Sequence, residues 1–397
     1  MPEPLQMLRI VTHEHSPRKG GAGVVAEQLA MAVARQGRDV EVWAQDGAVL
    51  PDEAVGASKY ALHAVPKLRG TRNLPCLVRM VRAIHADASS FSNAIVHVAE
   101  PAAVEAFFYL QWFPRKPWKR LILTVHGSEI RRWRKNPVNR ILFSKLAEAS
   151  DRIHVLSNYN AKEILSWMPG LASRLFMAYG VPNAELALPP REERSDSSNR
   201  RTVLLCVGRI HPRKGQLYLL QCINGLPRAY KDRIEVQFVG QVVKDGYNAE
   251  VSRLASQCGC PVVFAGGVSS EDLMRAYAGA DLFAMTSVPV GDSVEGLGLV
   301  YLEASRQGLP VLANRTGGVE DAVLDGVTGL LSDVGDADGF RHNLKRLIDS
   351  QALCSGLGAA GRLHVANHTW DDVAARLYHF DDPTRPADAL EVPNARV

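Results

Sequence analysis

The stretch Leu8-Arg9-Ile10-Val11-Thr12 is followed by a loop from His13 to Gly23, whose last residues read Lys19-Gly20-Gly21-Ala22-Gly23. The first five residues predict a short, largely apolar strand. Beyond the glycines, apolar side chains recur at helical spacing as far as Gly37, which ends the predicted helix. A strand, a glycine-rich turn and a helix in this order are typical of the opening unit of a doubly wound parallel sheet.

The same alternation of strand and helix continues along the chain, with one interruption. Residues 189–198 are polar, charged and proline-containing, as a linker would be. Further strands are expected on both sides of this segment, at 40–43, 94–98, 121–125, 152–156, 203–207, 236–239, 261–264, 282–285 and 310–313. The sequence therefore predicts an α/β protein with two Rossmann-like, doubly wound parallel-sheet domains. We place the first domain at 1–185, the linker at 186–200, the second domain at 201–368, a final helix at 369–382 and a flexible tail at 383–397.

Composition indicates a globular protein of two domains. The 397 residues are 46% hydrophobic and 22% charged, which suffices for two sizeable cores. No apolar run approaches the roughly 20 residues that cross a bilayer, and Met1–Met7 lack the features of a signal peptide. A cytoplasmic location is therefore expected, and the six scattered cysteines agree with reduced structural thiols. The net charge of +4 is mild and no nucleic-acid-binding motif accompanies it, so no nucleic acid partner is expected.

The segment Glu295-Gly296-Leu297-Gly298-Leu299-Val300-Tyr301-Leu302-Glu303 combines two carboxylates with two glycines at the start of a predicted helix. The glycines let backbone amides approach a ligand, and the positive end of a helix favours phosphate. The carboxylates can accept hydrogen bonds from hydroxyl groups. A nucleoside diphosphate sugar offers both kinds of group. An acidic helix with an ordinary cap is the alternative interpretation.

A basic loop, Gly208-Arg209-Ile210-His211-Pro212-Arg213-Lys214-Gly215, directly follows a predicted strand. Arg209 and Lys214 can hold one diphosphate from two sides, and their charge offsets the negative charge that builds on a departing diphosphate. The alternative is a solvated basic loop, but ligands bind at the carboxyl ends of parallel strands, where this loop lies.

Two further segments follow strands in the first half of the chain. The spacing in Lys19–Gly23 is neither the dinucleotide-binding fingerprint nor a Walker loop, which disfavours a dehydrogenase. Gly20 and Gly21 can cradle a phosphate or a sugar, or form a structural turn. His126, in Thr124-Val125-His126-Gly127-Ser128-Glu129, can bond a sugar hydroxyl or help a proton move, or it can be satisfied by the backbone.

Taken together, these segments resemble the retaining glycosyltransferases of the GT-B fold, specifically glycosyltransferase family four. The resemblance spans nearly the whole chain, and the pair Glu295 and Glu303 is its most specific part. It implies an acceptor domain and a donor domain that face a central cleft. Trp370 and the residues after it resemble the family's final helix, which crosses back to the first domain.

The resemblance implies a role for each matching residue. Arg209 and Lys214 would bind the donor diphosphate, Glu303 the ribose and Glu295 the transferred sugar. Amides near Leu299 and Val300 would contact the distal phosphate, and the base would lie near the backbone of Val268. The implied catalytic residues are Arg209, Lys214, Glu295 and His126; the implied donor-binding residues are Gly20, Gly21, Gly208, Val268, Gly296, Leu297, Gly298, Leu299, Val300 and Glu303.

The expected activity is transfer of a hexose, with retention, from a UDP-, GDP- or ADP-sugar to a hydroxyl of a sugar or lipid-linked acceptor. By the same resemblance, neither a metal nor a further cofactor is needed. Glu295 and Glu303 are interpreted as binding residues rather than as the acid and nucleophile of a glycosidase. A GT-B nucleotide-sugar epimerase and a non-catalytic sugar-nucleotide-binding subunit are the alternatives.

Two basic clusters in the first half each contain a tryptophan, Arg115-Lys116-Pro117-Trp118-Lys119-Arg120 and Arg131-Arg132-Trp133-Arg134-Lys135. Such clusters attract anionic membranes, and tryptophan is typical of the membrane interface. Peripheral contact with the inner face of a membrane is one interpretation. A solvated basic surface, or an anionic acceptor site without a membrane, is the other.

Overall fold

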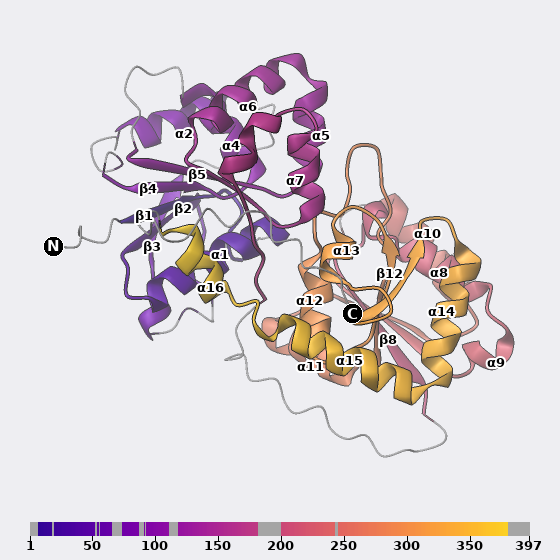
Figure 1. The fold of residues 1–397 in the computed structure, drawn as a ribbon. Helices are drawn as coiled ribbons and strands as arrows, with labels where there is room; N and C mark the ends of the chain where they lie inside the picture. The colour runs from indigo at the N-terminus through magenta and orange to yellow at the C-terminus, as the bar shows by residue number, and fades with distance from the viewer. Residues whose placement is uncertain are drawn as a thin grey trace. The chain divides into compact units, whose positions relative to one another are not determined.

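The computed structural model describes residues 7–17, 20–51, 54, 56–65, 74–86, 91, 93–110, 118–181, 200–242 and 245–379. The chain divides into two compact units, Met1–Gly180 with Thr369–Val397 (the first unit) and Val181–His368 (the second unit). In each unit helices flank a parallel sheet (Figure 1). The predicted tail, and the predicted linker except Arg200, lie outside the described residues.

The first unit contains a seven-stranded sheet with the order β3-β2-β1-β4-β5-β6-β7, in which all neighbours pair in parallel. The order reverses between β1 and β4, so the chain winds outward in both directions from this pair. In sheets of this kind the loops that leave the two strands at the reversal diverge, and ligands bind at the carboxyl ends of those strands. The strands are β1 (Leu8–Val11), β2 (Val40–Gln45), β3 (Ala61–Val65), β4 (Ile95–Val98), β5 (Arg120–Val125), β6 (Arg152–Val155) and β7 (Leu175–Met177).

Helices cover both faces of this sheet. On one face α1 (Gly21–Arg35) packs against α16 (Trp370–Leu377), the last helix of the chain. Arg35 pairs with Asp371, and Arg152 donates to the carbonyls of Arg376 and Leu377, which fastens both ends of α16 to the first unit. The other face carries α2 (Leu74–Ala86), α4 (Pro101–Leu110), α5 (Ser128–Lys135), α6 (Pro137–Ala149) and α7 (Asn158–Leu165), and short 3₁₀ turns lie at Gly56–Ser58 and Pro169–Arg174.

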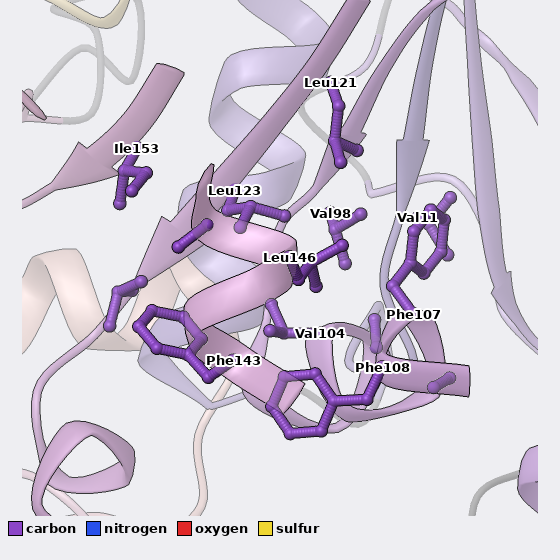
Figure 2. Packing of buried hydrophobic residues seen from close by; sticks show 14 of the residues in the cluster. Val11, Val98, Val104, Phe107, Phe108, Leu121, Leu123, Phe143, Leu146 and Ile153 are labelled. Carbon is purple, nitrogen blue, oxygen red and sulfur yellow. The ribbon is translucent and has the colours of Figure 1, made fainter. Parts of the chain in front are cut away.

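A large cluster of buried apolar residues in the first unit lies between the sheet and this second layer of helices. Phe107 and Phe108 of α4 and Phe143 of α6 are fully buried against strand residues such as Leu123 (Figure 2). Burial of each large apolar side chain contributes roughly 1.5–3 kcal/mol to folding. This packing holds the strand ends, and hence the polar loops beyond them, in place.

Both tryptophans of the basic clusters belong to the core, so the expectation that they are seated at a membrane interface is wrong. Trp118 packs on Phe107, with ring centroids 5.6 Å apart, and is 8% exposed. Trp133 is completely buried, stacks on Phe143 and donates its indole hydrogen to Glu105. The sequence places each tryptophan among cations, but every third or fourth residue of α5 faces inward, and Trp133 lies on that side. Residues 115–117 lie outside the described residues.

The second unit has the same design with six parallel strands in the order β10-β9-β8-β11-β12-β13. Here the order reverses between β8 and β11. The strands are β8 (Thr202–Val207), β9 (Ile234–Val239), β10 (Val262–Gly266), β11 (Leu282–Met285), β12 (Val311–Arg315) and β13 (Gly329–Asp333). The helices are α8 (Gln216–Asn224), α9 (Arg228–Lys231), α10 (Asp245–Gln257), α11 (Ser270–Gly279), α12 (Leu299–Arg306), α13 (Val319–Ala322), α14 (Ala337–Asp349) and α15 (Gln351–Ala366), with the 3₁₀ turn η3 (Pro212–Lys214).

The predicted fold class, two Rossmann-like parallel-sheet domains, is thus confirmed. The strands read from the apolar runs occur in the structure, with ends that differ by a few residues. In the described part of the chain, none of the helices combines the length and apolarity that a bilayer crossing demands.

Candidate functional site

The candidate site of the second unit lies where the loops after β8 and β11 meet. The loop after β8 runs through η3 to Gly215, which adopts a left-handed φ of 72°. A Cβ at Gly215 would come within 1.8 Å of the carbonyl oxygen of Thr286, just after β11. Thr286 in turn donates its hydroxyl to the carbonyl of Gly215 over 2.7 Å. Only glycine permits this close approach, which brings Lys214 beside the exit of β11.

Glu295 is the centre of a cluster of polar groups at this point. Its Oε2 lies 2.7 Å from Nζ of Lys214 and 2.9 Å from Nη1 of Arg213, and it accepts the hydroxyl of Ser287 over 3.1 Å. The Glu295 side chain is 8% exposed. Burial opposes its ionisation, but the two cations outweigh burial and lower its pKa to about 2. Glu295 is therefore ionised at neutral pH, and it holds both cations in one orientation.

Glu303 stands in a different environment on α12. It is half-buried, and its Oε2 accepts the hydroxyl of Tyr277 over 2.8 Å. Burial raises the pKa of Glu303 above its usual value, although Tyr277 and Lys214 oppose this rise. Burial and the nearby carboxylate also raise the pKa of Tyr277 well above normal, so the tyrosine stays a hydrogen-bond donor.

The backbone between these carboxylates forms the start of α12. Gly298, with a left-handed φ of 83°, precedes the first helical residue, and a Cβ there would lie 2.5 Å from the ring of Tyr301. Leu299 and Val300 belong to the first turn, where backbone N–H groups have no partner within the helix. Gly296 and Leu297 lead into this turn, and the side chain of Leu297 is buried, so the segment offers amides rather than side chains.

Other predicted residues of the second unit lie at its surface. Arg209 follows β8 and Gly208 directly, and its side chain is exposed. No described residue bonds to its guanidinium. Val268, beyond the end of β10, is 37% exposed. The structure thus brings Lys214 and Glu295 together, and it leaves Arg209 and Val268 at the surface of the same unit.

Three residues that the sequence did not single out contact one of the two glutamates: Arg213 and Ser287 contact Glu295, and Tyr277 contacts Glu303. Arg213 lay inside the basic loop and could have been included for that reason. Ser287 and Tyr277 carried no signal, because neither belongs to a motif that the sequence shows.

The predicted residues of the first unit gather at the carboxyl edge of its own sheet. Gly20 and Gly21 open α1, and Oε2 of Glu14 accepts the amides of Gly20 and Gly23 over 3.0 and 3.3 Å. His126 follows β5 and is half-buried; its Nε2 lies 2.9 Å from the carbonyl oxygen of Ala99. The Nδ1 atom is therefore the one through which His126 can meet a ligand. Lys19 lies outside the described residues.

The sequence pattern named Glycosyltransferase Family 4 matches residues 19–175, and the pattern named Glycosyl transferases group 1 matches residues 190–364. A GDP-mannose-dependent alpha-(1-6)-phosphatidylinositol monomannoside mannosyltransferase of Mycolicibacterium smegmatis is 31% identical over 382 residues, which cover 93% of this chain and 96% of the relative. The chain belongs to glycosyltransferase family 4. The enzyme of the same name from Mycobacterium tuberculosis is 29% identical over 395 residues, covering 95% of this chain and 99% of the relative.

Solved structures agree with this family 4 membership at the level of the fold. Sucrose-phosphate synthase from Thermosynechococcus elongatus superposes with a TM-score of 0.74 at 22% identity, covering 94% of this chain and 97% of that one. The HepE protein of Anabaena, in complex with UDP and glucose, gives a TM-score of 0.73 at 17% identity, covering 94% and 98%.

The predicted family, the GT-B fold and the predicted activity are thus confirmed: this family 4 member is a retaining glycosyltransferase that uses a nucleotide sugar. The individual roles of the site residues stay predictions. Within the described ranges, no group of three or more His, Cys, Asp and Glu side chains is arranged to hold a metal ion.

We expect the free energy of unfolding of Glu295→Gln to fall less steeply than that of the wild type as the pH is lowered below about 5. The pKa of Glu295 is about 2 in the folded protein against an ordinary 4.5, so its ionised form stabilises the fold above a pH of about 4.5. This contribution, about 3 kcal/mol for a shift of this size, is lost as the pH falls towards 2. Urea unfolding from about pH 5.5 to about pH 3 measures the slope. The exposed Glu271 provides the control variant Glu271→Gln, and equal slopes in the wild type and Glu295→Gln would contradict the expectation.

Proposed function

We propose that this glycosyltransferase moves a mannosyl group from GDP-mannose to a hydroxyl of a phosphatidylinositol-type glycolipid. The proposal is supported by relatives of that activity, which align along almost the whole chain. The relatives match both units of this chain, which matters because donor and acceptor would be recognised by different units.

The observation that carries the donor half of the proposal is the cluster of Arg213, Lys214 and Glu295. It gathers two cations and one carboxylate, hence a net charge of about +1, at the reversal of strand order in the second unit. A diphosphate that leaves a sugar gains negative charge, and cations held in place before the reaction stabilise that charge without reorganising.

The remaining donor contacts follow from the same arrangement. Lys214 and the exposed Arg209 would bind the diphosphate, together with the amides of Leu299 and Val300 at the start of α12. Glu303 would accept the ribose hydroxyls, and Glu295 would contact the transferred sugar. In the first unit His126 would bond a hydroxyl near the anomeric carbon, through Nδ1, and Gly20 and Gly21 would admit the donor close to the backbone.

We also propose that transfer needs no divalent metal. Metal ions in phosphoryl-containing sites neutralise the charge of the phosphates. Here Arg209, Arg213 and Lys214 would supply that positive charge from the chain itself, and the helix amides would add oriented dipoles.

Transfer from GDP-mannose to a phosphatidylinositol mannoside in detergent micelles is the direct test. We expect product with the newly formed bond in the α configuration, undiminished by a chelator, and a higher melting temperature with GDP-mannose than with UDP- or ADP-sugars. Product mass and NMR coupling measure the transfer, and a thermal-shift series measures donor choice. Transfer from a different nucleotide sugar alone would replace the proposed donor, and loss of activity on chelation would overturn metal independence.

We expect Lys214→Ala to lower turnover at saturating donor by about 10²–10³-fold, since it removes one preorganised donor from the leaving group. The fold survives, because Arg213 still pairs with Glu295. Steady-state kinetics and the melting temperature separate the two effects. Arg228→Ala, which changes an exposed cation on α9, is the matched control, and near-wild-type turnover of Lys214→Ala would refute the role of Lys214.

We further propose that the enzyme works in the cytoplasm at the inner face of an anionic membrane, where a lipid acceptor resides. The start of α6 supports this: Val138 is 63% and Ile141 54% exposed. Exposed cations lie close to these two residues in sequence, on α5 and α6: Arg134, Lys135, Arg140 and Lys145. Apolar tips among cations are typical of helices that lie in the membrane interface.

Flotation with liposomes tests this surface. We expect binding to vesicles that contain anionic lipid, weaker binding to neutral vesicles, and loss of binding in the double variant Val138→Asp with Ile141→Asp. Leu363→Asp, at another exposed apolar residue in the second unit, should leave flotation unchanged. Equal flotation of the double variant and the wild type would exclude this surface.

A further inference from the structure

Two cysteines of the second unit, Cys258 and Cys260, lie side by side between α10 and β10. The helix α10 ends at Gln257, and the strand β10 begins at Val262. The Sγ atoms of the two cysteines are 3.7 Å apart, close enough for one thiol to donate its hydrogen to the other. The proposed transfer reaction uses neither thiol.

The glycine between the two cysteines makes this arrangement possible. Gly259 has a left-handed φ of 76°, a conformation that a residue with a Cβ adopts only at a cost. A Cβ at this position would also lie 3.3 Å from Cδ of Lys231. A disulfide has an S–S bond of about 2.05 Å, so the two sulfurs need to approach by roughly 1.7 Å to form one. Rotation about the side-chain bonds suffices for a movement of this size.

The two thiols differ in their access to solvent. Cys258 is fully buried, and its Sγ lies 3.9 Å from the carbonyl oxygen of Leu220 on α8. Cys260 is only half-buried. A reagent that arrives from solution therefore meets Cys260 first.

The surroundings of the pair favour the thiolate form of Cys260. The hydrogen bond with Cys258 lowers the pKa of the Cys260 thiol, and the charges of Lys231 and Arg201 lower it further, although burial opposes them. The same hydrogen bond, together with burial, raises the pKa of Cys258. A thiolate is the form that attacks a disulfide. Cys260 is accordingly the nucleophile of the pair.

The positive charge at the pair favours an anionic reaction partner. Lys231 is half-buried beside Gly259, and Arg201 is exposed. Arg228 lies near the same turn, but it is paired with Asp232. A small disulfide that carries carboxylates would gain from these charges and would fit at the partly open Cys260.

We propose that Cys258 and Cys260 form a reversible dithiol–disulfide pair that reacts with anionic disulfides of low molecular weight. The thiolate of Cys260 attacks one sulfur of such an oxidant, whose S–S bond breaks, and one half of the oxidant leaves as a thiolate. Cys258 then loses its proton to solvent, and its sulfur attacks Sγ of Cys260 and expels the second half. Both leaving thiolates take up protons, so two cysteines are oxidised to one disulfide and the oxidant is reduced to two thiols.

The pair lies at the amino end of β10, away from the donor cluster. Lys214 and Glu295 lie beyond the carboxyl ends of β8 and β11 in the same parallel sheet. The exchange therefore needs neither the proposed donor nor the proposed acceptor. A partly exposed disulfide is readily reduced, so a reducing compartment keeps the pair as two thiols until small disulfides accumulate.

Mass spectrometry of the intact chain tests the pair, with oxidised glutathione as the probe. We expect the wild type to lose two hydrogen atoms, to give a peptide that links Cys258 to Cys260, and to regain both hydrogens with dithiothreitol. Cys258→Ser should keep one glutathione on Cys260, because the thiol that expels it is missing. Cys260→Ser should gain none on Cys258, which is buried. Cys354→Ser, which removes another buried thiol, is the matched control and should behave as the wild type.

Several results of the same experiment would contradict the proposal. One is a wild type that keeps glutathione on Cys260 and forms no internal disulfide. Others are a disulfide from either cysteine to a different cysteine or to a second chain, and an adduct on Cys258 in Cys260→Ser. The melting temperature of each variant, compared with that of the wild type, shows that the buried thiol has not been exposed by unfolding.

The charge of the reaction partner is tested with two oxidants. Oxidised glutathione carries a net negative charge, and cystamine is a cationic disulfide of similar reactivity. We expect Lys231→Gln to lower the ratio of the two rate constants, glutathione over cystamine, by about fivefold at low ionic strength, the effect of one charge at short range in water. Lys162→Gln, at an exposed lysine of α7, should leave the ratio unchanged. An unchanged ratio in Lys231→Gln would overturn the preference for an anionic partner.

Discussion

The reversal of strand order in each sheet is the constraint on which both sites depend. Parallel strands are joined by right-handed crossovers, so a sheet that grows outward in both directions has one pair of strands whose loops diverge. That pair is β1 and β4 in the first unit and β8 and β11 in the second. Polar residues in the loops after these strands meet although they are far apart in the sequence, as His13 meets Glu100 and Lys214 meets Glu295.

Near each of these reversals lies a buried carboxylate that is kept ionised. An isolated buried charge would cost several kcal/mol, so it must be paired and hydrogen-bonded. Glu295 is paired with Arg213 and Lys214, and Glu100 with His13 and two amides of α4. In both places the carboxylate holds the position of a more exposed basic group.

The apolar layers hold the strands, and hence these polar side chains, in fixed positions. The aromatic residues of α4, α5 and α6 fill the space above the first sheet, and Trp118 and Trp133 are part of that layer. A tryptophan within a run of arginines and lysines indicates a membrane interface when the run is taken as a surface patch. On a helix such as α5, however, the residue that faces inward is set by the helical period, and the surrounding cations occupy the outward positions.

The sequence by itself determined the fold class and the family, because these depend on local order: apolar runs for strands, glycines at turns, and Glu295 and Glu303 on one short segment. Only the tertiary structure decided which polar groups pair, since Lys214 with Glu295, Tyr277 with Glu303 and His13 with Glu100 join residues from different helices or loops. It also decided that Trp133 is core rather than surface. The physical reason is that sequence patterns report the periodicity of one element, whereas burial and pairing arise from the packing of several elements against each other.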